Sequence, residues 1–293
     1  MSKFALLREK AKRVFSIFLE KVKKIKILSI EIETTQTTAK PSYAEAFEEL
    51  LLKLDSEKVT IVVMVDEFPV AVENMAKEHG NTAALGFLHA NRGMRQRAGK
   101  GIRFIYTGSI GLPNVARKLG PDPTVNDLNI VEIPPLTIEE GLDMSLKIFN
   151  KYKVPVDEED VRYMLREIKW LMPFFIQLVI QLLIDETESE GLPVTSKMVD
   201  KVLLKAANHR NNIYFASYYD RLEKSLPADQ YEKAKSILAE IAEKEAVEAS
   251  QFNNGNNQLL LETLEYDGYI HEQSGYYRFN SPILRMWWGK NAR

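Results

Sequence analysis

Two adjacent carboxylate residues, Asp66 and Glu67, follow directly after a strongly apolar run, Val59 to Val65. An aspartate at the end of a strand can hold Mg²⁺, directly or through water, and a following glutamate can polarise an attacking water molecule as a general base. The pattern is therefore typical of half of a site that hydrolyses a nucleoside triphosphate. It also occurs as a solvated strand end, and the single sequence leaves the two interpretations evenly balanced.

Polar residues that follow a second apolar run favour the catalytic interpretation. Thr107, Gly108 and Ser109 follow another apolar run, "IRFIY". Ligands of a parallel α/β sheet bind at the carboxyl ends of its strands, where both tips would lie. We therefore predict Asp66 as the carboxylate that holds nucleotide-bound Mg²⁺, and Glu67, Thr107 and Ser109 as catalytic residues, with Thr107 or Ser109 sensing the terminal phosphate or orienting the water.

The other half of such a site is not found. It would be a glycine-rich loop that ends in Gly-Lys-Ser or Gly-Lys-Thr and comes before the Asp-Glu strand, because its backbone amides cradle the phosphates. The most similar stretch, "RAGKG", precedes a strand and lacks the hydroxyl that binds Mg²⁺, so we interpret it as a turn. No GxGxxG motif is present either.

The elements that would position these residues indicate an α/β fold. The run 59–65 is continuous and β-branched, which predicts a strand buried on both faces in a parallel sheet. A helix is expected over 81–98, a second strand over 101–109 and a third over 128–136, after a loop containing Pro121 and Pro123. The order of strand, helix, strand, loop and strand predicts an α/β layer sandwich with a partial parallel sheet.

The N-terminal segment has a different character. Residues 1–26 carry nine Lys or Arg and two Glu on a helical spacing, which predicts a basic amphipathic helix with a solvated face. Contact with nucleic acid or lipid headgroups is the alternative. Residues 27–33 alternate like a strand. Ser42 and Glu45 form a capping box that predicts a helix over 42–54.

From Pro135 onward the pattern is helical. Thr137 and Glu140 form another capping box, and two further helices meet near Pro173. Near residue 209 the pattern changes to two helices, a hairpin across Ser274 and Gly275, and a closing apolar segment, which predicts a winged helix. We therefore expect three domains: a truncated α/β core at 1–135, an all-α lid at 136–208 and a winged-helix domain at 209–293.

Bulk properties exclude several classes of function. The 293 residues include no cysteine, which excludes disulfides, thiolate metal sites and cysteine nucleophiles. The net charge of −2 gives no general attraction to nucleic acid or anionic lipid. The longest apolar run, 170–184, is shorter than the roughly 20 residues that span a bilayer. We expect a cytoplasmic protein with no membrane association.

Charge also guides the choice of partner. From Ala206 to the end there are ten Lys or Arg and twelve Asp or Glu, and the predicted recognition helix has no basic residue. Phosphate contacts need basic residues. A protein partner is therefore favoured over nucleic acid. Arg278 and Arg285 are the exceptions, as basic residues of this region that could contact phosphate. The sequence leaves a homo-oligomer open. Three arginines before the second strand are interpreted as a solvated helix end rather than as trans-acting arginines for a neighbouring subunit: Arg92, Arg95 and Arg97.

Several of these stretches together resemble one family. The segments "VVMVDEFP", "IRFIYTGSIGL", "IPPLTIEEG", "YDRLEKSL" and "FNSPILRMWW" are similar to the archaeal/bacterial AAA+-like ATPases, close to the STAND-type P-loop NTPases, over about Ile27 to Trp288. The resemblance implies an ASCE-type core, a helical lid and a C-terminal winged helix, with ATP and Mg²⁺ as cofactors. It also implies Asp66 as the Walker B metal carboxylate, Glu67 as the catalytic base and Thr107 as a sensor position near Ser109.

The sequence departs from that family at the phosphate loop. Members have a Walker A loop, with its helix and a further strand, upstream of the part present here. We expect the chain to be a fragment of a longer protein, although the gap could be filled by its own N-terminus or a partner, or the sheet could be smaller and free of nucleotide. Weak or no ATP hydrolysis by this chain alone follows. The alternative function is a non-enzymatic interaction module or DNA-associated adaptor built on a degenerate ATPase fold.

Overall fold

The computed structural model describes residues 47–48, 51–52, 60–120, 124–208, 212–252 and 257–291. The expected helix 1–26, the strand 27–33 and most of the helix 42–54 lie outside the described residues, although 47–48 and 51–52 are helical. Contacts divide the chain into two compact units. The first contains residues 1–109 and 121–127, and the second contains residues 110–120 and 128–293.

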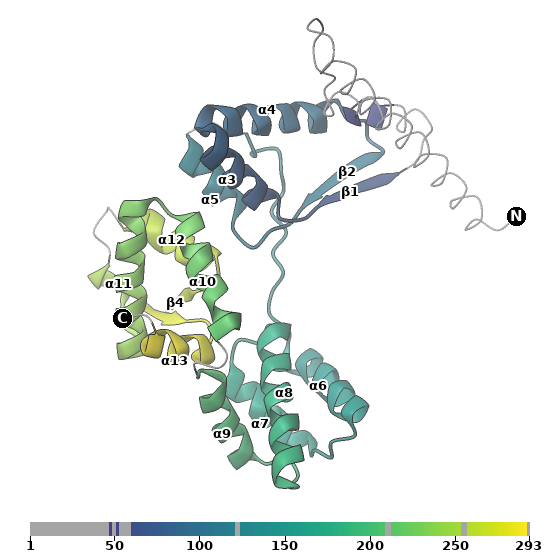
Figure 1. Cartoon of the computed structure of the whole chain (residues 1–293), viewed down its shortest axis with the longest axis vertical. Helices are drawn as coiled ribbons and strands as arrows, with labels where there is room; N and C mark the ends of the chain where they lie inside the picture. Colours follow the sequence, from purple (N-terminus) through teal and green to yellow (C-terminus); the bar gives the residue numbers. More distant parts are fainter. Residues whose placement is uncertain are drawn as a thin grey trace, which may run out of the picture. The chain divides into compact units, whose positions relative to one another are not determined.

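The first unit is built on a parallel pair of strands. Strand β1 (Ile61–Val65) pairs with β2 (Ile102–Tyr106), with Ile61 opposite Ile102. Two helices connect the strands, α3 (Phe68–His79) and α4 (Asn81–Arg97), as Figure 1 shows. The parallel pairing and the α/β class are confirmed. Helix α3, which begins directly after the carboxylate pair, was not predicted.

The sheet is shielded on one face only. Val62, Met64 and Ile105 are 51%, 71% and 44% exposed, so the prediction that the first strand is buried on both faces is wrong. Side chains on the opposite face are half-buried, and the core of this unit contains Phe68 and Val72 from α3. An alternating exposure of this kind is expected when only one face of a strand packs against other elements.

The predicted third strand is also wrong. Residues 128–136 form no strand, and their apolar side chains are open, with Ile130, Val131 and Ile133 at 62%, 82% and 84% exposed. A strand needs a ladder partner, and no described strand pairs with this segment, where the Leu136 N–H donates to the Leu171 carbonyl (3.0 Å) without forming a ladder. Pro134 and Pro135 also have no N–H group to donate. The predicted loop before it contains a helix, α5 (Leu112–Leu119), which belongs to the second unit.

After α5, the second unit continues with four helices in the described chain. They are α6 (Ile138–Tyr152), α7 (Glu158–Ile168), α8 (Pro173–Glu190) and α9 (Ser196–Ala206). The capping box of α6 is formed as predicted, because the Glu140 backbone N–H donates to Thr137 Oγ1 (3.2 Å) and the Thr137 N–H donates to Glu140 Oε2 (2.9 Å). Pro173 stands in the first turn of α8, where its missing N–H costs nothing.

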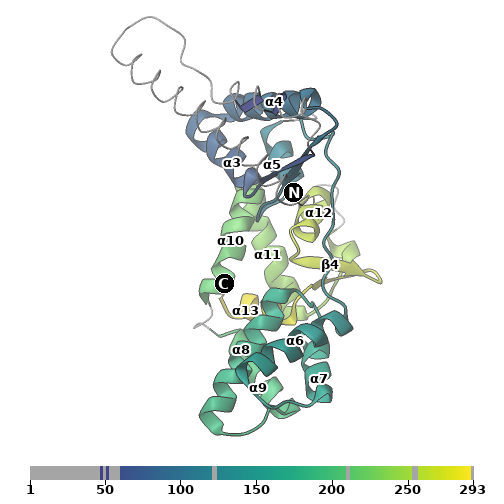
Figure 2. The same ribbon diagram turned by 90° about the vertical axis from the view of Figure 1, so that its right-hand side faces the viewer.

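The rest of this unit combines helices with a small antiparallel sheet of order β3-β5-β4. Its elements are α10 (Asn212–Ser225), α11 (Ala228–Lys244), β3 (Val247–Glu248), the 3₁₀ turn η2 (Ala249–Gln251), α12 (Gln258–Tyr266), β4 (Ile270–Gln273), β5 (Tyr276–Phe279) and α13 (Pro282–Asn291). The hairpin across Ser274 and Gly275 is confirmed, and Figure 2 shows α10 to α12 grouped beside it.

One hydrophobic core joins α6 to α13 of this unit. It runs from Leu142 on α6 to Trp288 on α13, and includes Phe215 of α10 stacked on Trp287 with ring centroids 5.3 Å apart. The segments expected as a lid and as a winged helix therefore share one core. Their division into separate domains, and the boundary at residue 135, stay predictions.

Candidate functional site

The carboxyl ends of β1 and β2 lie side by side. Their ladder continues beyond both strands, because the Thr107 N–H donates to the Val65 carbonyl (3.0 Å) and the Phe68 N–H donates to the Thr107 carbonyl (3.1 Å). These two bonds place the residues after each strand in register. The four residues predicted as a site, Asp66, Glu67, Thr107 and Ser109, are all exposed at this edge.

Asp66 is held through one of its two carboxylate oxygens. Its Oδ1 accepts hydrogen bonds from the Thr107 hydroxyl (2.5 Å) and from the Glu67 backbone N–H (3.0 Å). Its Oδ2 accepts none from any residue that the structure describes. Asp66 therefore has a fixed orientation and one exposed oxygen that is free to accept a hydrogen bond from a metal-bound water molecule.

Glu67 is held in the same way. Its Oε2 accepts hydrogen bonds from the backbone N–H and the hydroxyl of Ser109, both at 3.0 Å, and its Oε1 has no donor within the described part of the chain. The backbone of Glu67 adopts the left-handed conformation (φ 52°, ψ 30°) immediately before α3. A non-glycine residue in this region stores strain, which is often found at functional sites.

Gly108 is required by the close approach of the two strand ends. A Cβ atom at this position would lie 2.6 Å from Cδ of Pro69 and 2.9 Å from its Cγ. Because the proline ring is fixed to the backbone of α3, it cannot move away as a flexible side chain could. The glycine thus lets the 107–109 segment reach the carboxylates.

We expect Gly108→Ala to destabilise the first unit by about 2 kcal/mol, as an overpacked site does, and to separate Ser109 from Glu67. Chemical denaturation would measure the first effect, and the backbone amide resonance of Ser109 would report the second. Gly86→Ala, inside α4, is a suitable control for added volume, because a Cβ atom there would have no atom within 4 Å apart from its chain neighbours and the backbone of its own helix. Equal stability of the two variants would contradict the close approach.

Of the three arginines expected at a solvated helix end, one is buried. The side chain of Arg95 is only 6% exposed and pairs with Asp127, with Nη2 at 2.7 Å from Oδ1 and Nε at 3.0 Å from Oδ2. For Arg95 the prediction of a solvated residue is therefore wrong, and its guanidinium is committed within the first unit. Arg97 pairs with Glu48, and Arg92 lies 3.9 Å from Asp127.

This ion pair, in which Arg95 is buried and Asp127 is exposed, adjoins Tyr106 at the end of β2. The guanidinium of Arg95 lies over the Tyr106 ring at 5.5 Å, and the Tyr106 hydroxyl donates to Asn91 Oδ1 (2.8 Å). Burial raises the pKa of Tyr106, and the hydrogen bond from Arg95 lowers the pKa of Asp127. The cluster anchors β2 to α4 and to residues 124–127, so it supports the strand that carries Thr107 and Ser109.

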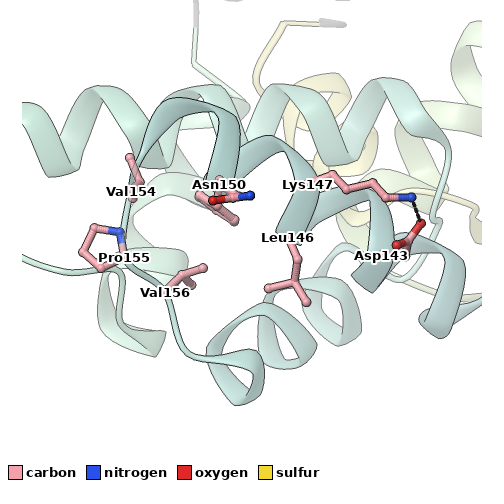
Figure 3. Close-up of a pocket in the computed structure, with 8 residues that line it drawn as sticks. Asp143, Leu146, Lys147, Asn150, Val154, Pro155 and Val156 are labelled. Carbon is pink, nitrogen blue, oxygen red and sulfur yellow. Dashed lines mark hydrogen bonds and ion pairs between the residues drawn. The ribbon is translucent and has the colours of Figure 1, made fainter.

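Other parts of the described chain offer weaker sites. No described group of three or more His, Asp or Glu could hold a metal ion, and no described helix is both long and apolar enough to cross a membrane. A hollow of about 440 Å³ lies beside α6 (Figure 3), but its carboxylate, Asp143, is paired with Lys147 at 2.7 Å. The remaining labelled residues around it include apolar Leu146 and Val156.

Comparison with known proteins adds evidence for the fold. No protein-family model matches the chain, and no curated protein is detectably similar in sequence. Among solved structures, a Walker-type ATPase of Pyrococcus abyssi is similar at a TM-score of 0.54 with 12% identity, over 89% of this chain and 75% of that one.

Two further structures are similar at lower scores. They are the ORC2 protein of Aeropyrum pernix (TM-score 0.49, 13% identity, 92% of this chain and 74% of that one) and the RuvB Holliday junction branch migration motor of Thermotoga maritima (TM-score 0.40, 11% identity, 78% and 71%). Both TM-scores are below 0.5, so neither comparison establishes a shared fold. The first comparison, at 12% identity, shows the fold alone. The fold of this chain is therefore similar to that of a Walker-type ATPase, as expected from the sequence.

Proposed function

We propose that this chain, whose fold is that of a Walker-type ATPase, carries the Walker B half of an ATP-hydrolysing site at Asp66 and Glu67. One observation supports this most directly: each carboxylate of the pair is held through one oxygen by a residue from the neighbouring strand end, and no described residue donates a hydrogen bond to its other oxygen. A solvated strand end gives no reason for such a paired arrangement. The carboxylates are also attached to the start of α3, whose N-terminal dipole favours negative charge.

The free oxygens suit the two roles expected of them. Asp66 Oδ2 would hold a water molecule of the Mg²⁺ ion that arrives with the nucleotide. Glu67 Oε1 would accept a proton from the attacking water, while Ser109 fixes the carboxylate through Oε2. Mg²⁺ supplies charge neutralisation at the phosphates. Thr107 keeps Asp66 oriented and would be the sensor position.

The phosphate-binding loop, the second half of an ATP-hydrolysing site, determines how well this chain could bind and hydrolyse ATP. The sequence has no Gly-Lys-Ser or Gly-Lys-Thr loop to cradle the phosphates. We therefore propose that the chain alone binds and hydrolyses ATP weakly, and that a partner protein or further polypeptide supplies the phosphate loop. Residues 209–293 would form a winged helix used mainly for protein contact.

Titration with Mg²⁺-ATP tests this proposal. At 100 times Kd, a ligand that binds only the folded state adds about 2.7 kcal/mol to the free energy of unfolding. We expect the midpoint of thermal unfolding to rise at millimolar Mg²⁺-ATP, and the rise to be smaller when EDTA removes Mg²⁺. A midpoint that is unchanged at millimolar Mg²⁺-ATP would exclude nucleotide binding by this chain.

A non-enzymatic interaction module is the second candidate. It is favoured by the apolar side chains that the first unit leaves open on its sheet, Val62, Met64 and Ile105. Exposed apolar groups on one face are typical of surfaces that bind another protein. Absence of any nucleotide effect, together with self-association in sedimentation velocity experiments that Met64→Lys abolishes, would favour this function over the first.

A further inference from the structure

A hollow of about 790 Å³ lies wholly within the second unit. Residues of the turn between α7 and α8, of the β4–β5 hairpin and of the start of α13 line it. Its volume is in the range that binds small organic molecules. The groups on its wall therefore indicate which kind of molecule would fit.

The wall of this hollow carries an excess of positive charge. Its cations are Lys169, Arg278 and Arg285, and its carboxylate is Glu245. Glu245 neutralises Arg285, whose Nη2 lies 3.0 Å from Oε1 of the carboxylate. Neither Lys169 nor Arg278 forms an ion pair with any residue that the structure describes. The hollow therefore keeps two cations that a bound anion could neutralise.

His271 stands next to one of these cations. It is directly opposite Arg278 in the β4–β5 ladder, so the two side chains are neighbours on one face of the hairpin. Its Nδ1 lies 2.8 Å from Oδ1 of Asn280 and donates to it, because the amide nitrogen of Asn280 is used for the Ile270 carbonyl (3.2 Å). Its Nε2 has no partner in the described part of the chain. A protonated imidazole donates from both nitrogens, so Nε2 can serve an anion beside Arg278.

The backbone at Lys169 is strained. Its dihedral angles are φ 61° and ψ −54°, and the Trp170 N–H donates to the Ile168 carbonyl (2.7 Å), which makes this a γ-turn of the rare, strained kind. Glycine would adopt this conformation without strain, so the lysine side chain needs another reason to be there. Strained residues of this sort gather at ligand sites. The turn places Lys169 and Trp170 together on the wall of the hollow.

Trp170 gives the hollow an aromatic wall. The ring is held from two sides, because a Cβ atom at Gly268 would lie 3.1 Å from its Cη2 and the ring of Phe175 lies 5.6 Å away between centroids. An aromatic wall beside two cations suits an anion that carries an organic group.

We propose that this hollow binds a small phosphomonoester, whose phosphate contacts Lys169, His271 and Arg278. The organic group of the ligand lies against Trp170. A phosphate monoester carries close to two negative charges and three strong acceptor oxygens, which matches three donors from separate elements. The extended backbone of a nucleic acid fits less well, because residues 206–293 carry twelve Asp or Glu and ten Lys or Arg.

Calorimetric titration of the full chain with phenyl phosphate tests the site. We expect a dissociation constant in the sub-millimolar range and a shift of the His271 ring resonances on binding. Arg278→Gln should weaken binding about tenfold, as the loss of one charge-assisted hydrogen bond allows. Arg166→Gln is the matched control, because Arg166 is an exposed arginine three residues before Lys169 that does not line the hollow. Its affinity should equal that of the wild type.

Lys169→Gly separates ligand binding from folding. Glycine accepts the positive φ at this turn, so the midpoint of thermal unfolding should not fall, while the affinity for phenyl phosphate should drop about tenfold. A purely structural lysine would give the reverse, a lower midpoint with unchanged affinity, and that result would overturn the assignment of Lys169. Unchanged affinity in both Lys169→Gly and Arg278→Gln would overturn the site.

Other probes determine the class of ligand. Phenol lacks the phosphate, and binding of phenol as tight as that of phenyl phosphate would overturn an anion site. Inorganic phosphate lacks the organic group and should bind more weakly than phenyl phosphate. Duplex DNA that binds the chain and is displaced by phenyl phosphate would overturn the assignment to a small ligand.

This site is independent of the proposed ATP site. Asp66→Asn, in the first unit, should leave the affinity for phenyl phosphate unchanged, and Arg278→Gln should leave any effect of Mg²⁺-ATP on the unfolding midpoint unchanged. Loss of phenyl phosphate binding in Asp66→Asn would mean that the probe occupies the ATP site, and would overturn the separate site in the second unit.

Discussion

Replacing Glu67 by glutamine is expected to lower the rate of ATP hydrolysis about 10²- to 10⁴-fold, the usual contribution of a general base. Glutamine has nearly the same shape, and its carbonyl oxygen can still accept the two hydrogen bonds that Ser109 donates. The substitution therefore removes the ability to take a proton while keeping the side chain in place. Initial rates of phosphate release at high Mg²⁺-ATP, with the polypeptide that supplies the phosphate loop present, would measure the loss.

Two variants make this experiment specific. Glu78→Gln, at an exposed position on the same helix α3, should leave the rate unchanged. Asp66→Asn should weaken the dependence on Mg²⁺ and raise KM, because Asp66 is expected to bind rather than to move a proton. A Glu67→Gln protein that hydrolyses ATP at the rate of Glu78→Gln would contradict the assignment of Glu67 as the base.

Truncation of Arg95 to alanine should lower the free energy of unfolding of the first unit by about 2 kcal/mol, the usual contribution of hydrogen bonds to charged groups. The side chain makes two hydrogen bonds to Asp127 and one to the Thr124 carbonyl (3.2 Å), and it covers the ring of Tyr106. Its removal would leave Asp127 without its main partner. Urea denaturation would measure the loss, with unfolding followed by far-ultraviolet circular dichroism, which does not depend on tryptophan fluorescence.

The pH dependence of this effect has a definite sign. The pKa of Asp127 is lowered in the folded protein, so its contribution to stability is fully present above the ordinary carboxyl pKa, near about 4, and disappears as the pH falls through the folded value. The difference between wild type and Arg95→Ala should therefore shrink on acidification below about pH 4. Arg103→Ala, an exposed position on β2, should change stability little at any pH, and a loss as large as that of Arg95→Ala would contradict the prediction.

The approach of Asp66 to Thr107 could be predicted from the sequence because it depends on one general rule. Two apolar runs that form parallel strands must bring their carboxyl ends to the same edge, whatever the rest of the chain does. The capping box of Thr137 and Glu140 was predictable for a similar reason, since every atom involved lies within one turn. The catalytic roles of these strand-end residues stay predictions.

Tertiary context explains what sequence analysis missed. The segment 128–136 has the composition of a strand, but pairing depends on a neighbour that the segment does not specify. The pairing of Arg95 with Asp127 joins residues 32 positions apart, and no local pattern indicates it. Helix α3 had a usable signal, because Pro69 in its first turn and the i, i+4 pair Phe68 and Val72 are typical of a helix start.

The two units are interleaved along the polypeptide. The backbone passes from one to the other after Ser109, returns after Gly120 and leaves again after Asp127. A shortened protein that starts at Leu128 would therefore lose an internal piece of the second unit, and one that stops at Ser109 would lose the aspartate that neutralises Arg95. Neither unit can therefore be produced by truncating the chain at one position. Separate expression of the second unit requires residues 110–120 to be joined to the portion that starts at residue 128, and the first unit must keep residues 121–127.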